Sequence, residues 1–377
     1  MAGSAAGVRY TRPLNELGRG DAPAFGGKSA TLGELLAAEI PVPSGFAVST
    51  AAFAAFLEQS QLAGRLEDAL TGLAPGELAA IEAASRSVGE ALRAAPVPDA
   101  VADELARRYA ELADTAGIEC PPVAVRSSAL GEDSQDATYA GQQETYLWVT
   151  GAQQVCDAVR DCWVSLYSPT AISYRLRLGA GSAAAEPEPA EPEPAEPEPA
   201  KPEAMGVTVQ LMVDAAVSGV LFTCNPVSGD PSMVAINASW GLGLAVVGGE
   251  VTPDDYLVSK VTGEVVRERL HAKQVEYVPD RSGRGAVRIE VAPERRELAC
   301  VDHEALAALL DTARRVERHF GCPQDVEWAI AREQALPESL FVVQSRAVTG
   351  LGKKSQSKPR SAISMVMGTF GVKDAAD

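Results

Sequence analysis

Histidine is scarce in this chain, and the cysteines are not grouped. Only three histidines occur among 377 residues, and the six cysteines are scattered without a Cys-x-x-Cys pair. A structural zinc site needs such residues at short, regular spacing, so the sequence argues against one. Scattered cysteines in a chain of this length are typical of reduced thiols in the cytoplasm.

Long apolar runs and an excess of basic charge are also missing. No segment stays apolar for long enough to cross a bilayer, and the N-terminus lacks the apolar core of a secretory signal. The formal net charge is −18, which argues against a protein that binds nucleic acid or anionic membranes. We therefore expect a cytoplasmic protein that binds neither membranes nor nucleic acid.

A strict P-loop is absent as well, although residues 20–29 (GDAPAFGGKS) resemble one. That motif has four residues between its first glycine and the Gly-Lys pair, because this length wraps backbone N–H groups around a phosphate. Counting back from Gly27, the first glycine should stand where the chain has Ala22. Lys28 therefore needs a different explanation if it contacts phosphate.

A Glu-Pro repeat divides the chain. Residues 183–204 read AAAEPEPAEPEPAEPEPAKPEA, and proline without a donor, combined with repelling glutamates, cannot pack a core. We predict an extended, solvated insertion; a docking tail for a basic partner is the alternative. The sequence suggests four parts: a helix-rich subdomain at 1–180, the insertion at 181–204, a strand-rich subdomain at 205–350 and a flexible tail at 351–377.

Periodicity supports this division. Val101, Leu105, Tyr109 and Leu112 follow one face of a helix, and a second helix is predicted over residues 306–320. Alternating apolar residues after the repeat predict strands, with a hairpin that turns at Thr262-Gly263. Helix-rich and strand-rich portions in one chain predict an α+β architecture.

The first polar constellation follows an apolar strand. The apolar stretch VAV, residues 123–125, leads into Arg126, two serines and an acidic loop. A strand-end arginine that faces such a loop suits a bound anion, and Thr138, Gly141 and Gln142 form a turn whose N–H groups can approach phosphate oxygens. The alternative is a surface ion pair between Arg126 and the nearby acidic loop.

The second constellation lies on two strands near residue 350. In DVEWAI, Asp325 and Glu327 share one face; in LFVVQSR, we expect Leu340, Val342, Gln344 and Arg346 to share a face. If the strands pair, Glu327, Gln344 and Arg346 cluster as two oxygen ligands for Mg²⁺ and a fork for phosphate. A solvated sheet face is the alternative.

A third stretch, GLGLAVVGGE at 241–250, has a Gly-x-Gly that could suggest nucleotide binding. The third glycine of the dinucleotide fingerprint would stand where the chain has Val246. We therefore interpret this stretch as a tight loop after a strand that ends at Trp240.

These stretches together resemble the nucleotide-binding, N-terminal part of the phosphoenolpyruvate synthase and pyruvate phosphate dikinase family, which includes rifampin phosphotransferase. The resemblance covers most of residues 14–350 and is carried, in family order, by residues 25–49, 123–149, 218–230, 238–260, 324–330 and 341–350. It implies an ATP-grasp fold, in which two subdomains hold Mg²⁺ and ATP between them.

The resemblance also assigns roles to individual positions. Lys28, Arg126 and Arg346 match cations at the ATP phosphates and would be the catalytic residues. Glu327 and Gln344 match ligands of Mg²⁺ and nucleotide. The loop over the phosphates matches Thr138, Gly141 and Gln142, and the strand along the adenine matches Gln210, Met212 and Val213.

The sequence departs from the family in two ways that bear on function. Ala347 stands where the family usually has proline, which should loosen a turn only. No histidine has the Gly-Gly…His context of the family's swivelling domain. We therefore expect an ATP-binding subunit that phosphorylates a histidine on a separate partner and releases AMP and phosphate.

The final acceptor follows from a further resemblance. In extent the chain is similar to the smaller subunit of phenylphosphate synthase, which implies a phenol-like acceptor; a pyruvate or water dikinase and a rifampin-type phosphotransferase are alternatives. Two other classes stay open, namely a non-catalytic ATP sensor and a stand-alone kinase that would release ADP.

Overall fold

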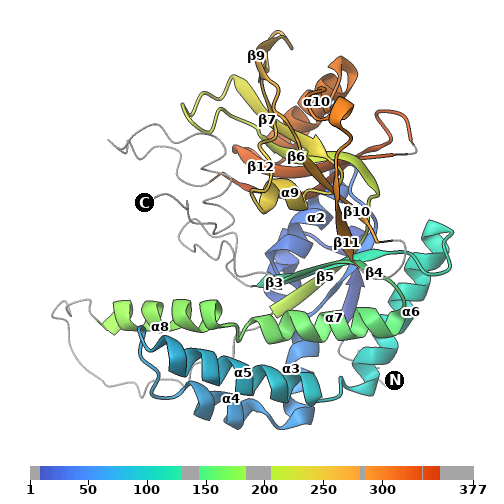
Figure 1. The fold of residues 1–377 in the computed structure, drawn as a ribbon. Helices are drawn as coiled ribbons and strands as arrows, with labels where there is room; N and C mark the ends of the chain where they lie inside the picture. Colours follow the sequence, from blue (N-terminus) through green and yellow to red (C-terminus); the bar gives the residue numbers. More distant parts are fainter. Residues whose placement is uncertain (1–8, 130–143, 184–204, 281–284, 333, 349–377) are drawn as a thin grey trace.

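A computed structural model describes residues 9–129, 144–183, 205–280, 285–332 and 334–348. Within these ranges the chain forms two main antiparallel sheets with helices packed on them (Figure 1). The α+β class expected from the sequence is therefore confirmed. The Glu-Pro repeat from residue 184 onward and the tail after residue 348 lie outside the described residues.

The first sheet has five strands among the described residues, in the order β1-β2-β5-β3-β4. Their bounds are Thr11–Pro13, Gly45–Val48, Met205–Leu211, Val123–Ala129 and Thr145–Val149. β5 lies in the centre and is buried along almost its whole length, although it follows the Glu-Pro repeat. The sequence boundary at 204 thus does not coincide with the change of sheet, and the subdomain division stays a prediction.

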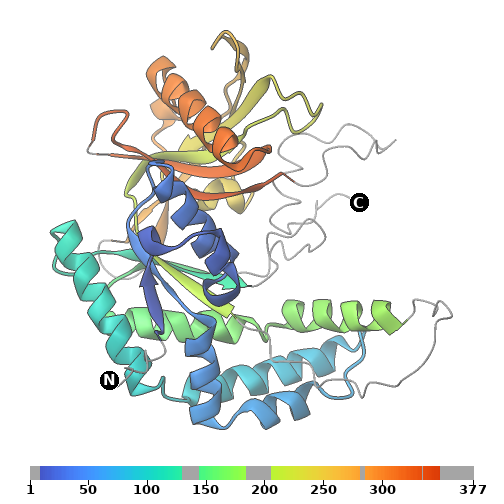
Figure 2. The same cartoon turned by 180° about the vertical axis from the view of Figure 1, so that it is seen from behind.

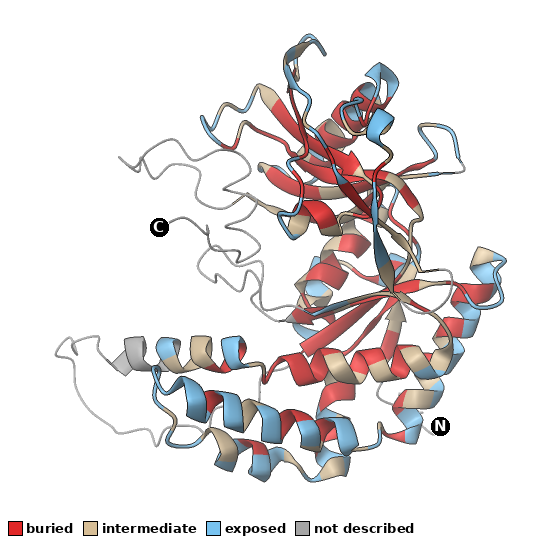
Figure 3. Ribbon diagram, viewed as in Figure 1, coloured by how far each residue is buried: buried red, intermediate tan, exposed pale blue. Residues whose placement is uncertain are grey.

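Helices cover this sheet and extend beyond it (Figure 1). The helices are α3 Thr50–Ser60, α4 Ala63–Leu70, α5 Leu78–Ala94, α6 Asp99–Ala116, α7 Ala152–Ser165 and α8 Pro169–Ala183. The predicted face of α6 is confirmed, because Val101, Leu105, Tyr109 and Leu112 are all buried. Figure 3 shows the buried strands between helices whose outer faces are exposed.

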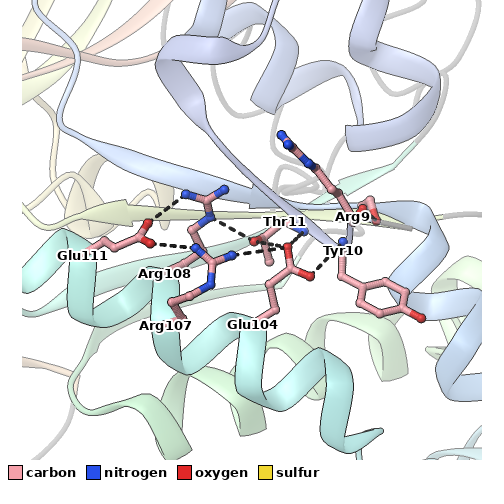
Figure 4. A network of polar contacts seen from close by, with 8 residues as sticks. Arg9, Tyr10, Thr11, Glu104, Arg107, Arg108 and Glu111 are labelled. Carbon is pink, nitrogen blue, oxygen red and sulfur yellow. Dashed lines mark hydrogen bonds and ion pairs between the residues drawn. The ribbon is translucent and has the colours of Figure 1, made fainter. Parts of the chain in front are cut away.

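One carboxylate fastens α6 to the first strand (Figure 4). Glu104 accepts hydrogen bonds from the backbone N–H groups of Tyr10 and Thr11 at 3.1 and 2.9 Å, and from Thr11 Oγ1 at 2.8 Å. Arg107 and Arg108 extend the contacts along the helix. These bonds satisfy donors of β1, an edge strand whose outer side has no strand partner among the described residues.

The second sheet has six strands among the described residues, in the order β13-β12-β6-β7-β8-β9. Their bounds are Leu340–Ala347, Gln324–Ala331, Ala215–Phe222, Met233–Trp240, Asp254–Ser259 and Val265–Arg269. The predicted hairpin is confirmed, because β8 and β9 pair and Gly263 adopts a positive φ of 77° at their turn. The helix α10, His303–Phe320, covers one face (Figure 2).

The helix that joins the two sheets by packing is α2, Gly27–Ala37. It follows the short α1, Ala22–Phe25, and contacts β13 of the second sheet as well as β3 and β5 of the first. Leu32 and Leu35 belong to one apolar core with Val326 and Trp328 of β12. The N-terminal segment therefore stabilises the C-terminal sheet directly.

A two-stranded ribbon completes the region between the sheets. Its strands are β10, Val275–Pro279, and β11, Ala286–Glu290. Tyr277 bridges to Gly241 and Leu242 after β7, where the one-turn helix α9, Leu244–Val247, lies. In Figure 1 the ribbon descends from the second sheet toward β4.

Candidate functional site

A cavity of about 490 Å³ lies between the two sheets. Its wall is drawn from the N-terminus of α2, from β3 to β5 of the first sheet, from β6, β12 and β13 of the second, and from the segment after β7. This volume lies within the range that small-molecule pockets occupy. The cavity is therefore large enough for a nucleotide-sized ligand.

Eight residues assigned from the sequence lie on this wall. They are Lys28, Arg126, Gln210, Met212, Val213, Glu327, Gln344 and Arg346. The other three, Thr138, Gly141 and Gln142, lie outside the described residues. The fold thus brings together positions up to 318 residues apart in number, from Lys28 to Arg346. Their roles as ligands stay predictions.

Lys28 enters the cavity from the first turn of α2. Gly26 precedes the helix with a φ of 83°, and a Cβ there would lie 2.2 Å from the carbonyl oxygen of Ser128. Only glycine permits this approach, which places the helix start against β3. Lys28 is 8% exposed, and its Nζ donates to the Ser127 carbonyl at 3.2 Å. A lysine this buried favours the presence of an anion nearby.

Arg126 crosses from the first sheet to the second. Its Nη1 donates to the Val343 carbonyl at 2.9 Å, and its Nη2 donates to Glu327 Oε2 at 3.0 Å and to Gln344 Oε1 at 2.8 Å. Its Nε is buried and has no hydrogen-bond partner among the described residues. The acidic loop that was the alternative ion-pair partner of Arg126 lies outside the described residues.

The strands β12 and β13 pair as the sequence suggested, and Glu327 lies directly opposite Gln344. One expectation is wrong, because Leu340 and Val342 do not share a face with Gln344 and Arg346. Leu340 and Val342 pack in the core under α10, whereas Gln344 and Arg346 line the cavity. The reason is a register shift between Glu327 and Trp328, since a bulge reverses the side to which the following residues point.

Arg346 is held by a carboxylate that the sequence reasoning did not assign. Its Nε and Nη2 donate to Asp325 Oδ2 at 3.0 and 2.9 Å. Burial raises the pKa of Asp325 to about 6, although Arg346 acts in the opposite direction. Asp325 shares a strand face with Glu327, and this alternation in the sequence could have indicated that Asp325 belongs to the site. Asp325 thus aims the guanidinium of Arg346 at the cavity.

Most of the rest of the wall is apolar, and its polar members are Glu144, Thr145, Gln210 and Ser218. Met212 and Val213 lie in the link between β5 and β6, and the segment from Leu242 to Val247 lies across from them. Gln210 is buried, and its Nε2 donates to the Pro43 carbonyl at 3.3 Å. The interpretation of residues 241–250 as a tight loop was incomplete, because this segment contains α9 and forms part of the wall. The apolar residues that lie between glycines in this segment could have indicated that it forms part of a cavity wall.

Hard oxygen ligands are few around the cavity. No group of three or more His, Cys, Asp or Glu side chains suited to a metal occurs among the described residues. Glu327 and Gln344, however, both present an oxygen to one nitrogen of Arg126. Because this pair already surrounds a positive charge, it fits a hard divalent cation whose other ligands come from phosphate and water.

The three histidines lie elsewhere in the described structure, and none is among the residues that line the cavity. His319 is exposed, its ring lies edge-on to that of Phe320 at 4.9 Å between ring centroids, and its Nε2 lies 3.3 Å from Glu34 Oε2. His271 Nδ1 lies 2.8 Å from the Pro253 carbonyl. His303 is exposed at the start of α10.

Across the described residues, no helix has the length and apolar character needed to cross a membrane. Among known proteins the chain is similar to several phosphoenolpyruvate synthases. It is 33% identical to the phosphoenolpyruvate synthase of Pyrococcus furiosus, over 93% of this chain and 45% of that protein. Probable phosphoenolpyruvate synthases of Staphylothermus marinus and Methanothermobacter thermautotrophicus are 35% and 36% identical, over 90% and 93% of this chain and 41% and 47% of their own length.

The chain therefore spans less than half the length of these three relatives. The crystal structure of the D-cycloserine synthetase DcsG aligns with 90% of this chain and 66% of its own, but at 11% identity and a TM-score of 0.22 it supports no assignment. Residues 22–366 match the family described as pyruvate phosphate dikinase, AMP/ATP-binding domain. This match includes every residue that lines the cavity, and the chain belongs to that family of nucleotide-binding domains.

Proposed function

We propose that this chain is the ATP-binding unit of a dikinase-type phosphotransferase. Its cavity would hold ATP with the phosphates near Lys28, Arg126 and Arg346, and with the adenine against Met212, Val213 and the segment 242–247. The main support for this proposal is that three cationic side chains from three different elements meet in one largely apolar cavity. The ATP-grasp arrangement, in which the two sheets close on the nucleotide, is part of this proposal.

The three cations would act by stabilising charge that moves during transfer. When a phosphorus–oxygen bond breaks, negative charge develops on the leaving oxygen, and preorganised cations favour that state over the ground state. Arg346 is preorganised by Asp325, and Lys28 by the fixed start of α2. A Mg²⁺ between Glu327 and Gln344 would bridge phosphate oxygens and align them.

The proposed reaction proceeds in two steps. An imidazole nitrogen attacks the β-phosphorus of ATP, the bond from that phosphorus to the oxygen shared with the α-phosphate breaks, and AMP leaves with the bonding electrons. Water then attacks the outer phosphorus of the diphosphoryl-histidine, which releases phosphate and leaves a phosphohistidine. The described residues need only position the phosphates, because the attacking imidazole comes from elsewhere.

We assign that imidazole to a separate partner subunit with a swivelling, phosphorylatable histidine domain. The support is that His271, His303 and His319 do not line the cavity. A histidine delivered by a mobile partner could reach the phosphates and then carry the phosphoryl group to an acceptor. The partner, rather than this chain, would bind that acceptor.

Two acceptor classes deserve direct comparison. The names of the relatives at 33–36% identity support a pyruvate-like acceptor. A phenol-like acceptor, expected from the resemblance to phenylphosphate synthase, is the second candidate. A rifampin-type hydroxyl is the third candidate and has no specific observation in its favour.

The test is to incubate the full chain with ATP, Mg²⁺ and a partner that carries the histidine domain, and to identify the nucleotide product by chromatography. We expect AMP, phosphate and a phosphohistidine on the partner. Formation of ADP without AMP would refute the dikinase mechanism, as would transfer in the absence of a partner. ATP binding without any turnover would favour the non-catalytic sensor.

A further inference from the structure

The guanidinium of Arg126 contacts both of the oxygens that would hold a metal ion in the proposed function. Its Nη2 is 3.0 Å from Glu327 Oε2 and 2.8 Å from Gln344 Oε1, and these are the two hard oxygens that the cavity offers from neighbouring strands. A magnesium ion would need the same oxygens at about 2.1 Å. The guanidinium and a divalent cation therefore cannot occupy this position together.

The arrangement around Arg126 is firmly held. The Nη1 donates to the Val343 carbonyl on the same strand as Gln344, so three acceptors of the second sheet hold one side chain of the first. The side chains of Arg126 and Glu327 are only 14% and 20% exposed. Charge-assisted bonds at this depth are stronger than surface ion pairs, so a divalent cation alone would have to displace a favourable partner.

One nitrogen of Arg126 has no hydrogen-bond partner within the part of the chain that the structure describes. This is the buried Nε, and a further acceptor would recover the free energy that an unsatisfied donor costs. A phosphate group offers several oxygens in the geometry that a guanidinium prefers. Lys28, whose Nζ bonds to the carbonyl of Ser127, next to Arg126 in the chain, adds a second positive charge. Phosphate is therefore the ligand best suited to draw Arg126 away from Glu327 and Gln344.

We propose that Arg126 is a metal-excluding latch, formed by its contacts with Glu327, Gln344 and the Val343 carbonyl. In the nucleotide-free chain the latch occupies the metal ligands, so that divalent cation binds there only after nucleotide phosphate has taken up Arg126. This inference rests on the proposed function, because it assumes that phosphate enters this cavity. It adds an order of events, in which phosphate contact precedes metal coordination by the protein.

The latch also links ligand binding to the arrangement of the sheets. Arg126 belongs to β3 of the first sheet, and its three acceptors belong to β12 and β13 of the second. Release of the latch removes these contacts between the sheets, and bound phosphate and metal replace them. The carboxylate of Glu327, which Arg126 leaves, stays compensated because the metal ion neutralises its charge.

The test measures Mn²⁺ binding to the full chain without nucleotide, by the electron paramagnetic resonance signal of free Mn²⁺. Wild type is compared with Arg126→Gln, with the double variant Arg126→Gln/Glu327→Gln, and with Arg332→Gln. Arg332 pairs with Asp214 at 3.1 Å and does not line the cavity, so its substitution removes the same charge elsewhere. Circular dichroism and thermal unfolding verify that each variant is folded.

The latch predicts at least about tenfold tighter Mn²⁺ binding by Arg126→Gln than by wild type, as expected for the loss of a competing charge-assisted bond. The gain should disappear in the double variant and be absent in Arg332→Gln. Equal Mn²⁺ affinity in wild type and Arg126→Gln would overturn the proposal. A gain that survives Glu327→Gln would do so too, because the metal would then bind elsewhere.

A second measurement keeps Arg126 in place, in case its substitution prevents folding. Binding of ATP in EDTA, without metal, is compared for wild type, Glu327→Gln and Glu144→Gln, since Glu144 also lines the cavity but is not bonded to Arg126 in the latch. The latch predicts tighter ATP binding by Glu327→Gln than by Glu144→Gln. Equal affinities in these two variants would count against it. A wild type that binds no ATP would refute the proposed function instead, whatever the Mn²⁺ result.

Discussion

The cavity wall has two parts that are built in different ways. The polar part consists of Lys28, Arg126, Glu327, Gln344 and Arg346, which are held by specific hydrogen bonds. The apolar part consists of the link between β5 and β6 and the segment after β7, and it is held by packing. A small displacement of a side chain in the polar part breaks a hydrogen bond. In the apolar part the same displacement only changes the area of contact.

The two parts also differ in how far apart their residues lie in the chain. Arg126 and Gln344 touch across 218 residues of sequence, whereas much of the apolar wall comes from two short segments at 211–213 and 242–247. The polar part therefore depends on both sheets and on their relative position. We expect substitutions there to affect catalysis strongly and substitutions in the apolar part to affect affinity modestly.

The largest effect is expected at the polar part. Arg346→Ala and Glu327→Ala should each lower the rate of AMP formation by about 10³-fold or more, because cations and metal ligands at a transferring phosphoryl group contribute on this scale. Both variants should keep the circular dichroism spectrum of wild type. Turnover near the wild-type rate in either one would show that the polar part is not the reaction site.

Two glycines on the wall should differ sharply in stability. A Cβ at Gly219 would lie 1.8 Å from the Asn237 carbonyl oxygen, whereas at Gly243 the nearest atom would be 3.7 Å away. Gly219→Ala should thus lower the free energy of unfolding by about 3 kcal/mol or more, and Gly243→Ala should leave it nearly unchanged. Urea denaturation measures both. Similar stability of the two variants would contradict the close packing of β6 against β7.

Asp325, which holds Arg346 of the polar part, should affect stability and activity in different ways. Burial raises its pKa from the ordinary value of 3.8 to about 6, so the native state holds the proton more tightly than the unfolded chain. Its contribution to stability is therefore complete below about pH 4 and is lost as the pH rises through 6, by up to about 3 kcal/mol.

Asp325→Asn removes this titration and keeps the shape of the side chain. The difference in unfolding free energy between wild type and this variant should fall from pH 4 to pH 6, so that the variant is at least as stable at pH 7. It should nevertheless lose activity, because Arg346 loses its charged partner. Parallel pH profiles of the two proteins would mean that the carboxyl is not perturbed.

The smallest effect is expected at the apolar part, where adenosine is the sharpest probe because it has no phosphates. Met212→Ala should weaken adenosine binding by about fivefold through lost apolar contact. Lys28→Met should leave adenosine binding unchanged and weaken ATP binding. Calorimetric titration of both ligands gives this comparison. If Lys28→Met weakened adenosine equally, the two parts of the wall would not be separable.

The sequence alone predicted elements well where periodicity was strong. The face of α6 was correct because four apolar residues repeat at helical spacing and are all buried. The hairpin at Gly263 was correct because a turn that requires positive φ selects glycine. The pairing of β12 with β13, and hence Glu327 beside Gln344, followed from two adjacent strands.

Local patterns failed where a long-range contact or a small irregularity decided the outcome. A bulge at Val343 of β13 placed Leu340 and Val342 on the opposite face from Gln344, and alternation alone cannot show an added residue. The membership of β5 in the first sheet could not be predicted either, because strand pairing between distant segments leaves no periodic trace in either segment.

By itself, then, the sequence determined which residue types could serve a phosphate and on which elements they stand. Only the tertiary structure decided that Arg126 holds Glu327 and Gln344, and that Asp325 holds Arg346. The physical reason is that hydrogen bonds and ion pairs act over about 3 Å. Chain segments that lie hundreds of residues apart reach that distance only when both sheets are in place.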